Sequence, residues 1–360
     1  MSKVWCVTIL ILLLFKIEGR TEEKTGDRSF KNVHLFKNLS QPDLSRVMSF
    51  IRASLGVHCD YCHLVGKNGW DFGNDSKAPK IKARQMIRMV MEINKSNFKG
   101  EPEVSCFTCH QGRIRPNGTP PLPQKEPPFP TPIAESGIVE ADAGKILEEY
   151  VQATGGEAIS KIRSAKTLVM KGTTDETWKR KVVPYEVYYK APDKWRIRKT
   201  LEDGVVTYGF DGKNAWAQEG AETRTMGEGE VAVFRETIDS LKLLPEVESR
   251  KPKAVKKRTM NDRVAFALEY EFPGGITEYY YFDAETHRLK GRRRYTPSPI
   301  GIIPQQINYE NYKELHGVTI PYTLRSDYVD PWIGGTHNFT EILIDVPLED
   351  SQFQMPSGKQ

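Results

Sequence analysis

The chain has 360 residues, of which 28% are charged and 38% are hydrophobic, and its formal net charge at pH 7 is +5. This length suits two domains. Residues 20–118 hold 17 Lys and Arg against 10 Asp and Glu, a local difference of +7. Because these basic residues are scattered along the chain, their pattern argues against a nucleic-acid-binding surface.

Residues 1–19 have the pattern of a signal peptide. A short basic start is followed by an apolar run from Val4 to Phe15, which suits a signal core and is too short for a full membrane span. We therefore expect an exported, periplasmic protein. The cleavage site near Gly19 is poorly defined, so an uncleaved signal anchor in the membrane is the alternative. Cys6 lies inside the apolar run and is interpreted as a buried hydrophobe.

The other four cysteines belong to two Cys-x-x-Cys-His motifs, CDYCH at residues 59–63 and CFTCH at residues 106–110. This is the pattern for attachment of a c-type haem. Two cysteines at this spacing can each bond a haem vinyl group, and the next residue turns its imidazole toward the iron. A structural zinc site is the competing interpretation, but it gives no reason for a histidine after both cysteine pairs. The prediction is two haem c groups, attached through Cys59, Cys62, Cys106 and Cys109 and ligated by His63 and His110.

Each motif is preceded by an expected helix that carries methionine. The first helix begins at Ser40 as N-cap and ends at Gly56, and the second runs from Lys80 to Asn94. A methionine thioether as second axial ligand raises the reduction potential of a haem and closes its iron to other ligands. Met48 is the candidate for the first haem. For the second haem the candidates are Met86, Met89 and Met91, and spacing does not choose between the first two, which share a helix face.

Charged and polar side chains near the motifs are candidates for contact with haem propionates. Four arginines flank the haem-bearing elements: Arg84, Arg88, Arg113 and Arg115. For each of them a solvated surface position is the plain alternative. His34 and His58 have no forced role.

Four segments of this region resemble the cytochrome c subunit of photosynthetic reaction centres. They are residues 32–36 (NVHLF), 53–63 (ASLGVHCDYCH), 83–90 (ARQMIRMV) and 106–112 (CFTCHQG). The resemblance covers about residues 30–116 and implies an all-α dihaem module with the axial methionines at Met48 and Met86. The family subunit has four haem motifs and this chain has two, so the resemblance leaves open whether the role is photosynthetic or respiratory.

A proline-rich stretch, residues 117–139, is expected to be a semi-rigid linker. Residues 140–353 then predict a helix from Asp142 to Ile162, interrupted at Gly155, followed by many short strands separated by turns. A helix from Val231 to Leu243 breaks the series of strands. The fold class is therefore α+β with two domains: an all-α dihaem module, and a curled antiparallel β-sheet with about two helices, which buries Tyr185, Val187 and Tyr189 on one face.

The second domain resembles the lipoprotein-carrier and lipoprotein-sorting family through residues 146–156 (ILEEYVQATGG) and 209–216 (GFDGKNAW). The resemblance implies an open β-barrel with a helical lid that holds acyl chains in its concave face. No catalytic residues are predicted here, since His287, His316 and His337 lie on different expected elements without metal-ligand spacing.

The sequence thus predicts a periplasmic dihaem electron carrier that is not an enzyme. Its expected partners are redox proteins, including a membrane-bound electron-transfer complex, and a lipid or lipoprotein is the candidate ligand of the β-domain. Two other functions remain open. One is a peroxidase-like haem enzyme, which needs an iron with an open position. The other is a lipid- or lipoprotein-binding protein with an accessory redox module.

Overall fold

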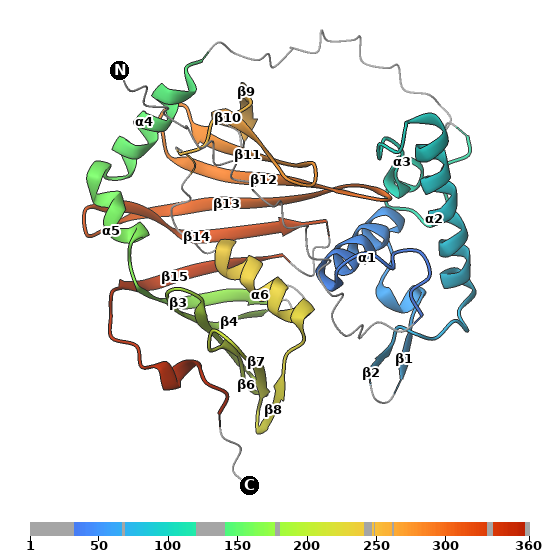
Figure 1. The fold of residues 1–360 in the computed structure, drawn as a ribbon, viewed down its shortest axis with the longest axis horizontal. Coiled ribbons are helices and arrows are strands. Elements are labelled where there is room, and N and C mark those ends of the chain that lie inside the picture. Colours follow the sequence, from blue (N-terminus) through green and yellow to red (C-terminus); the bar gives the residue numbers. More distant parts are fainter. Residues whose placement is uncertain are drawn as a thin grey trace, which may run out of the picture.

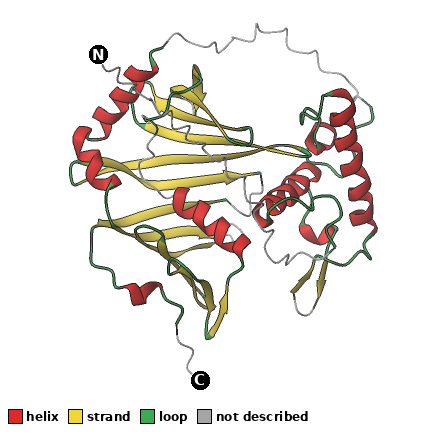
Figure 2. Ribbon diagram, viewed as in Figure 1, coloured by secondary structure: helices red, strands yellow, loops and turns green. Residues whose placement is uncertain are grey.

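The computed structural model describes residues 32–66, 69–119, 141–176, 181–240, 247, 249–260, 263–329 and 334–356. These residues form a mainly helical module (residues 32–119) and a β-domain (residues 141–356) built on one large sheet (Figures 1 and 2). The predicted signal peptide and residues 120–139 of the predicted linker lie outside the described residues. None of the helices in the described ranges is long and apolar enough to cross a membrane.

Helix α1 (Gln41–Leu55) has the two ends that its sequence predicts. The Ser40 hydroxyl accepts a hydrogen bond from the Asp43 backbone N–H at 3.3 Å, and Pro42 lies in the first turn. Gly56 ends the helix with φ +65°, a left-handed conformation that glycine adopts without steric cost. Local signals account for where this helix begins and ends.

The rest of the module departs from the all-α expectation. Helix α2 (Ala78–Asn97) extends beyond the predicted ends, and α3 (Cys106–His110) is a single short turn. Between the 3-10 turn η1 (Cys59–Tyr61) and α2 lies a hairpin of β1 (Leu64–Gly66) and β2 (Gly69–Asp71). Val65 pairs with Trp70 across this hairpin, a β-branched and aromatic pair that favours strand pairing. The module is therefore mainly helical rather than all-α.

The described residues of the β-domain form thirteen strands in one antiparallel sheet. Their bounds are β3 (Thr167–Glu176), β4 (Lys181–Lys190), β5 (Lys194–Leu201), β6 (Gly204–Phe210), β7 (Ala215–Glu219), β8 (Glu222–Thr225), β9 (Ala254–Met260), β10 (Arg263–Phe272), β11 (Ile276–Asp283), β12 (Leu289–Ser298), β13 (Gly301–Leu315), β14 (Val318–Tyr328) and β15 (Gly335–Ile344). The spatial order is β8-β7-β6-β5-β4-β3-β15-β14-β13-β12-β11-β10-β9. The chain thus runs outward from β3 to one edge, crosses through α6 (Glu228–Ser240), and returns from the opposite edge to β15 beside β3 (Figure 1). The predicted antiparallel sheet is confirmed, and it is open.

Helices cover one face of this sheet. Helix α4 (Ala143–Thr154), the turn η2 (Gly156–Ala158) and α5 (Ile159–Arg163) replace the predicted helix, with the break near Gly155 as expected. Tyr150 of α4 and Ile238 of α6 are buried in one cluster with Tyr185, Val187 and Trp195 of the sheet. The predicted burial of one face of β4 is confirmed for Tyr185 and Val187, whereas Tyr189 is only half-buried.

The β-domain also contributes to the core of the helical module. Ile300 and Ile303, at the tip of the β12–β13 hairpin, are buried in one cluster with Phe50 of α1 and Cys106 of α3. A Cβ on Gly301 would lie 2.7 Å from Cβ of Ser105 and 2.9 Å from Cζ of Phe50, so the hairpin backbone at Gly301 packs directly against these two side chains. In Figure 1 the long strands β12 and β13 extend toward α1 and α3. The hairpin tip is thus part of the module's core.

Candidate functional site

The first Cys-x-x-Cys-His motif forms a tight turn after α1. The backbone carbonyl of Cys59 accepts hydrogen bonds from the N–H groups of Cys62 at 3.2 Å and His63 at 2.9 Å. Cys59 is exposed and Cys62 is half-buried, and both carry free thiols. The turn therefore presents two unoxidised sulfurs and an imidazole from five consecutive residues.

The side chains predicted for the first site line one cavity of about 400 Å³. Met48 comes from α1, whereas Cys59, Cys62 and His63 come from the motif. The remaining wall is mostly apolar and includes Leu44, Ile51, Leu55, Val57, Phe72 and Ile87. This size is within the range of small-molecule and cofactor sites. The structure thus brings the four sequence-predicted residues together around one apolar space.

The chemistry of these side chains fits a covalently bound haem. Burial, followed by the positive charges of Lys80, Arg84 and Lys77, lowers the pKa of His63, and this favours the neutral imidazole that a metal binds. Nδ1 of His63 is buried without a hydrogen-bond partner among the described residues. Two thiols, a neutral imidazole and a thioether are the groups that attach and ligate a haem c.

Two sets of hydrogen bonds fix the start of the second motif. Ser105 and Thr108 form a capping box at the start of α3, with reciprocal distances of 3.2 and 3.0 Å. The buried amide of Asn94 on α2 donates to the Val104 carbonyl at 2.7 Å and accepts from the Val104 N–H at 2.9 Å. Burial raises the pKa of Cys106 to about 11, while Cys109 is exposed. In the second motif, therefore, the Cys106 thiol is buried and the Cys109 thiol is exposed.

His110 has a defined hydrogen bond that leaves one ring nitrogen free for a metal. Its Nδ1 lies 2.9 Å from the carbonyl oxygen of Arg113. A carbonyl only accepts, so Nδ1 carries the proton and Nε2 keeps its lone pair. Backbone carbonyls commonly orient metal-binding histidines in this way.

The methionines of α2 differ in their surroundings. Met86 is half-buried, Met89 is 46% exposed, and Met91 packs against the cluster that contains Ile87 and Val90. These surroundings do not identify which methionine ligates the second haem, so Met86 stays a prediction.

A direct backbone contact joins the two motif regions. The N–H of Gly112, two residues after the second motif, donates to the carbonyl of Ser54 at 2.9 Å. Ser54 is in the last turn of α1, a few residues before the first motif. The chain around one motif is thus held against the chain around the other.

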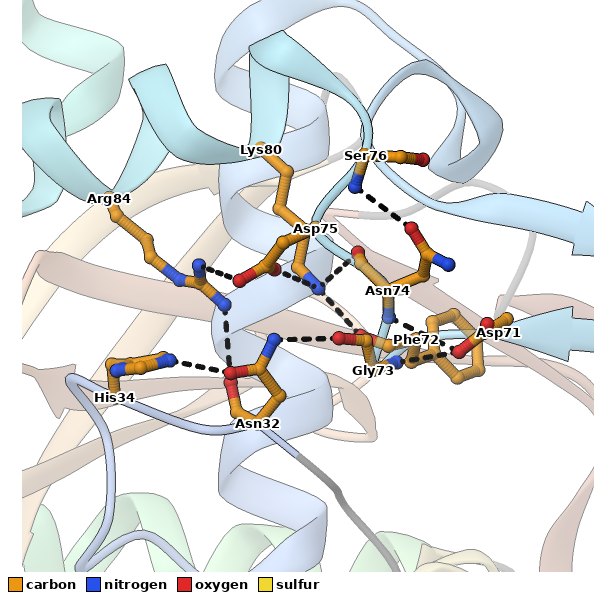
Figure 3. A network of polar contacts seen from close by, with 10 residues as sticks. All are labelled: Asn32, His34, Asp71, Phe72, Gly73, Asn74, Asp75, Ser76, Lys80 and Arg84. Carbon is orange, nitrogen blue, oxygen red and sulfur yellow. Dashed lines mark hydrogen bonds and ion pairs between the residues drawn. The ribbon is translucent and has the colours of Figure 1, made fainter.

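One wall of the first cavity is a polar network that sequence reasoning mostly missed (Figure 3). Lys80 and Arg84 both pair with Asp75, at 2.9 and 2.7 Å. Arg84 was a sequence candidate, whereas Lys80 and Phe72 were not. The turn-forming residues 71–76 before α2 are the signal that could have indicated an ordered loop here.

The other histidines near this cavity have polar partners. Nε2 of His34 lies 2.5 Å from Oδ1 of Asn32, and Nδ1 of His58 lies 3.3 Å from a guanidinium nitrogen of Arg52. Both side chains line the cavity.

The histidines of the β-domain lie on different elements. His287 pairs with Glu149 at 3.2 Å, whereas His337 stacks on Tyr185 with ring centroids 4.8 Å apart. Over the described ranges, no three His, Cys, Asp or Glu side chains converge as a metal site.

Solved structures similar to this chain include a LolA superfamily protein from Nitrosomonas europaea. It has 11% identity and a TM-score of 0.36, and the match covers 59% of this chain and 98% of that protein. A putative outer membrane lipoprotein-sorting protein domain from Vibrio parahaemolyticus has 11% identity and a TM-score of 0.35, with 58% and 95% covered.

Residues 16–128 match the family described as photosynthetic reaction centre cytochrome C subunit. The photosynthetic reaction center cytochrome c subunit of Roseobacter denitrificans is 31% identical over 102 residues, which are 26% of this chain and 27% of the relative. Cytochrome c-554 of Chloroflexus aurantiacus is 32% identical over 85 residues, 22% of this chain and 20% of the relative. The chain thus spans about a quarter of these relatives. Its N-terminal part, which holds both Cys-x-x-Cys-His motifs, resembles the reaction-centre cytochrome c subunit, as its four segments predicted.

Proposed function

We propose that this protein is an exported dihaem c-type cytochrome that carries electrons. The observation that supports it most is that Met48, Cys59, Cys62 and His63 line one apolar cavity. Thioether, thiols and imidazole are the groups that attach and ligate a haem c, and here the thiols and imidazole belong to a Cys-x-x-Cys-His motif. The family match over residues 16–128 agrees with this proposal.

Each residue has a role in this proposal. Cys59 and Cys62 attach the first haem, and Cys106 and Cys109 attach the second. His63 and His110 are the proximal ligands, and Met48 and Met86 are the distal ligands. A bound haem supplies one-electron chemistry. With methionine as second ligand, each iron would have no open position for a substrate, and the haems would serve electron transfer.

The contact between Ser54 and Gly112 supports electron passage between the two haems, because it holds the two attachment regions side by side. Electrons then enter and leave through redox protein partners, among them a membrane-bound complex. In this proposal the domains are residues 1–19 (signal), 30–116 (cytochrome), 117–139 (linker) and 140–353 (β-domain).

The test is a haem count on protein made in a host that attaches c-type haem. Mass spectrometry of the denatured chain should find two covalent haems in the wild type. The double variants Cys59→Ala/Cys62→Ala and Cys106→Ala/Cys109→Ala should each retain one haem. A wild-type chain without covalent haem, or with zinc in its place, would overturn the proposal.

Optical and magnetic spectra of the same protein test the carrier role. Two irons that each have histidine and methionine as axial ligands should be low-spin and slow to bind cyanide. A high-spin iron with rapid cyanide binding would instead favour a peroxidase-like enzyme.

A further inference from the structure

Lys80 is a buried lysine whose three N–H donors each have a partner. Its residue is 8% exposed, and Nζ donates to the carbonyls of Phe72 at 2.8 Å and Asn74 at 2.7 Å. The third partner is Oδ1 of Asp75 at 2.9 Å. An ammonium group has three donors, so this group is saturated. Lys80 therefore clamps the loop between β2 and α2 onto the helix.

The clamped loop carries the residue that packs on the proximal ligand. The ring of Phe72 meets the imidazole of His63 edge to face, with centroids 5.1 Å apart and an interplanar angle of 77°. Phe72 is itself 44% exposed, so burial alone does not fix it. The hydrogen bond from Lys80 holds the Phe72 carbonyl, and Trp70 stacks on the Phe72 ring with centroids 5.6 Å apart.

The same network sets the charge of this cavity wall. Arg84 pairs with Asp75 at 2.7 Å and donates to the carbonyl of Asn32 at 3.2 Å (Figure 3). Asn32 in turn donates to the carbonyl of Gly73 at 2.6 Å, which fixes the loop from the other side. One carboxylate thus balances two cations, and Lys80 and Arg84 both line the cavity. A wall with an excess positive charge disfavours the oxidised iron, which carries one more positive charge than the reduced iron.

We infer that Lys80 is a positioning residue for the first haem: it holds Phe72 against His63 and, with Arg84, raises the reduction potential of that haem. This inference rests on the proposed function, since it needs a haem on Cys59 and Cys62. Axial-ligand orientation and nearby charge are both known ways for a protein to tune a haem.

The experiment compares Lys80→Met with Lys82→Met in the haem-loaded protein. Both changes remove one lysine charge from α2, but Lys82 is exposed. Redox titration gives the two haem potentials, and the first haem is identified as the one whose potential moves in Met48→His. Lys80→Met should lower the potential of the first haem and leave the second near its wild-type value. Lys82→Met should leave both potentials near their wild-type values.

Two further variants separate charge from positioning. Lys80→Arg keeps the charge, so the reduction potential of the first haem should stay closer to the wild-type value than in Lys80→Met. Phe72→Leu keeps every charge and should alter the electron paramagnetic resonance signal of the first haem, because that signal reports how the imidazole is oriented. These two variants also keep the test decisive if Lys80→Met does not fold.

Some results would overturn the inference while leaving the proposed function intact. They are equal shifts of both potentials in Lys80→Met, equal effects of Lys80→Met and Lys82→Met, or a wild-type electron paramagnetic resonance signal of the first haem in Phe72→Leu. A haem missing from the wild-type Cys59 and Cys62 would instead contradict the proposed function itself.

Discussion

A Cβ atom placed on Gly56 would lie 2.1 Å from the carbonyl oxygen of Gly112. Gly56 ends the helix that precedes the first Cys-x-x-Cys-His motif, and Gly112 follows the second. The two backbones touch where any side chain at Gly56 would separate them. Glycine at this position therefore sets how closely the two motifs approach.

Replacing Gly56 with alanine should destabilise the helical module. The left-handed φ of +65° costs a non-glycine residue about 1–2 kcal/mol, and the overlap with Gly112 adds about 1–3 kcal/mol. Gly100→Ala is the matched control, since its φ is +88° and nothing lies within 4 Å of the added Cβ. Chemical denaturation followed at the haem absorbance measures both variants. Equal losses in the two variants would show that close approach does not matter at Gly56.

Helix α1 shows what could be predicted from the sequence. Its N-cap, its apolar spacing and its terminal glycine are local signals, and the helix begins and ends where they indicate. The strands of the β-domain also follow their alternation, as the buried Tyr185 and Val187 illustrate. Cys59, Cys62 and His63 were predicted from a short motif and Met48 from its place on the preceding helix, and all four line one cavity.

The roles of Lys80 and Ile300 could not be predicted in this way. From the sequence, a lysine near the start of an expected helix is interpreted as a solvated charge. Only the conformation of residues 72–75 brings two backbone carbonyls and a carboxylate to Lys80. Ile300 lies at a strand turn, where its burial depends on a module far away in the sequence. Both roles arise from contacts that no local pattern encodes.

His337 should make the stability of the β-domain depend on pH. Burial, and then the charge of Lys199, lowers the pKa of this histidine to about 4. The unfolded chain binds the proton near pH 6.5, before the folded chain does. Stability from the neutral ring is therefore fully present above pH 6.5 and is lost as the pH falls toward 4, by at most about 3 kcal/mol.

The measurement is the free energy of unfolding at several pH values, compared between the wild type and His337→Gln. In His337→Gln the free energy of unfolding should fall much less between pH 6.5 and 4 than in the wild type. His316→Gln, at an exposed histidine in the β13–β14 turn, is the control and should keep that fall. Parallel pH profiles for His337→Gln and the wild type would refute this assignment.

Leucine in place of Met86 should remove the distal ligand of the second haem. We expect the low-spin histidine and methionine spectrum of one haem to be lost and its potential to fall, because a thioether ligand raises the potential. Met89→Leu and Met91→Leu change the same kind of side chain on the same helix and should leave both spectra unchanged. If Met86→Leu keeps the spectrum and one of the two controls loses it, the ligand is the methionine replaced in that control.

Alanine in place of Ile300 should weaken the contact between the β-domain and the helical module. Ile300 is fully buried against the cluster that contains Phe50 and Cys106, so its truncation should cost about 2–5 kcal/mol. Ile302 is 48% exposed on the same hairpin, and Ile302→Ala should change stability by no more than about 0.5 kcal/mol. Thermal unfolding followed by haem absorbance and by far-ultraviolet circular dichroism measures the two parts separately. In Ile300→Ala the haem transition should move to lower temperature than the β-sheet transition, because the hairpin tip no longer supports the module. Coincident transitions with wild-type midpoints would mean that the module folds without this support.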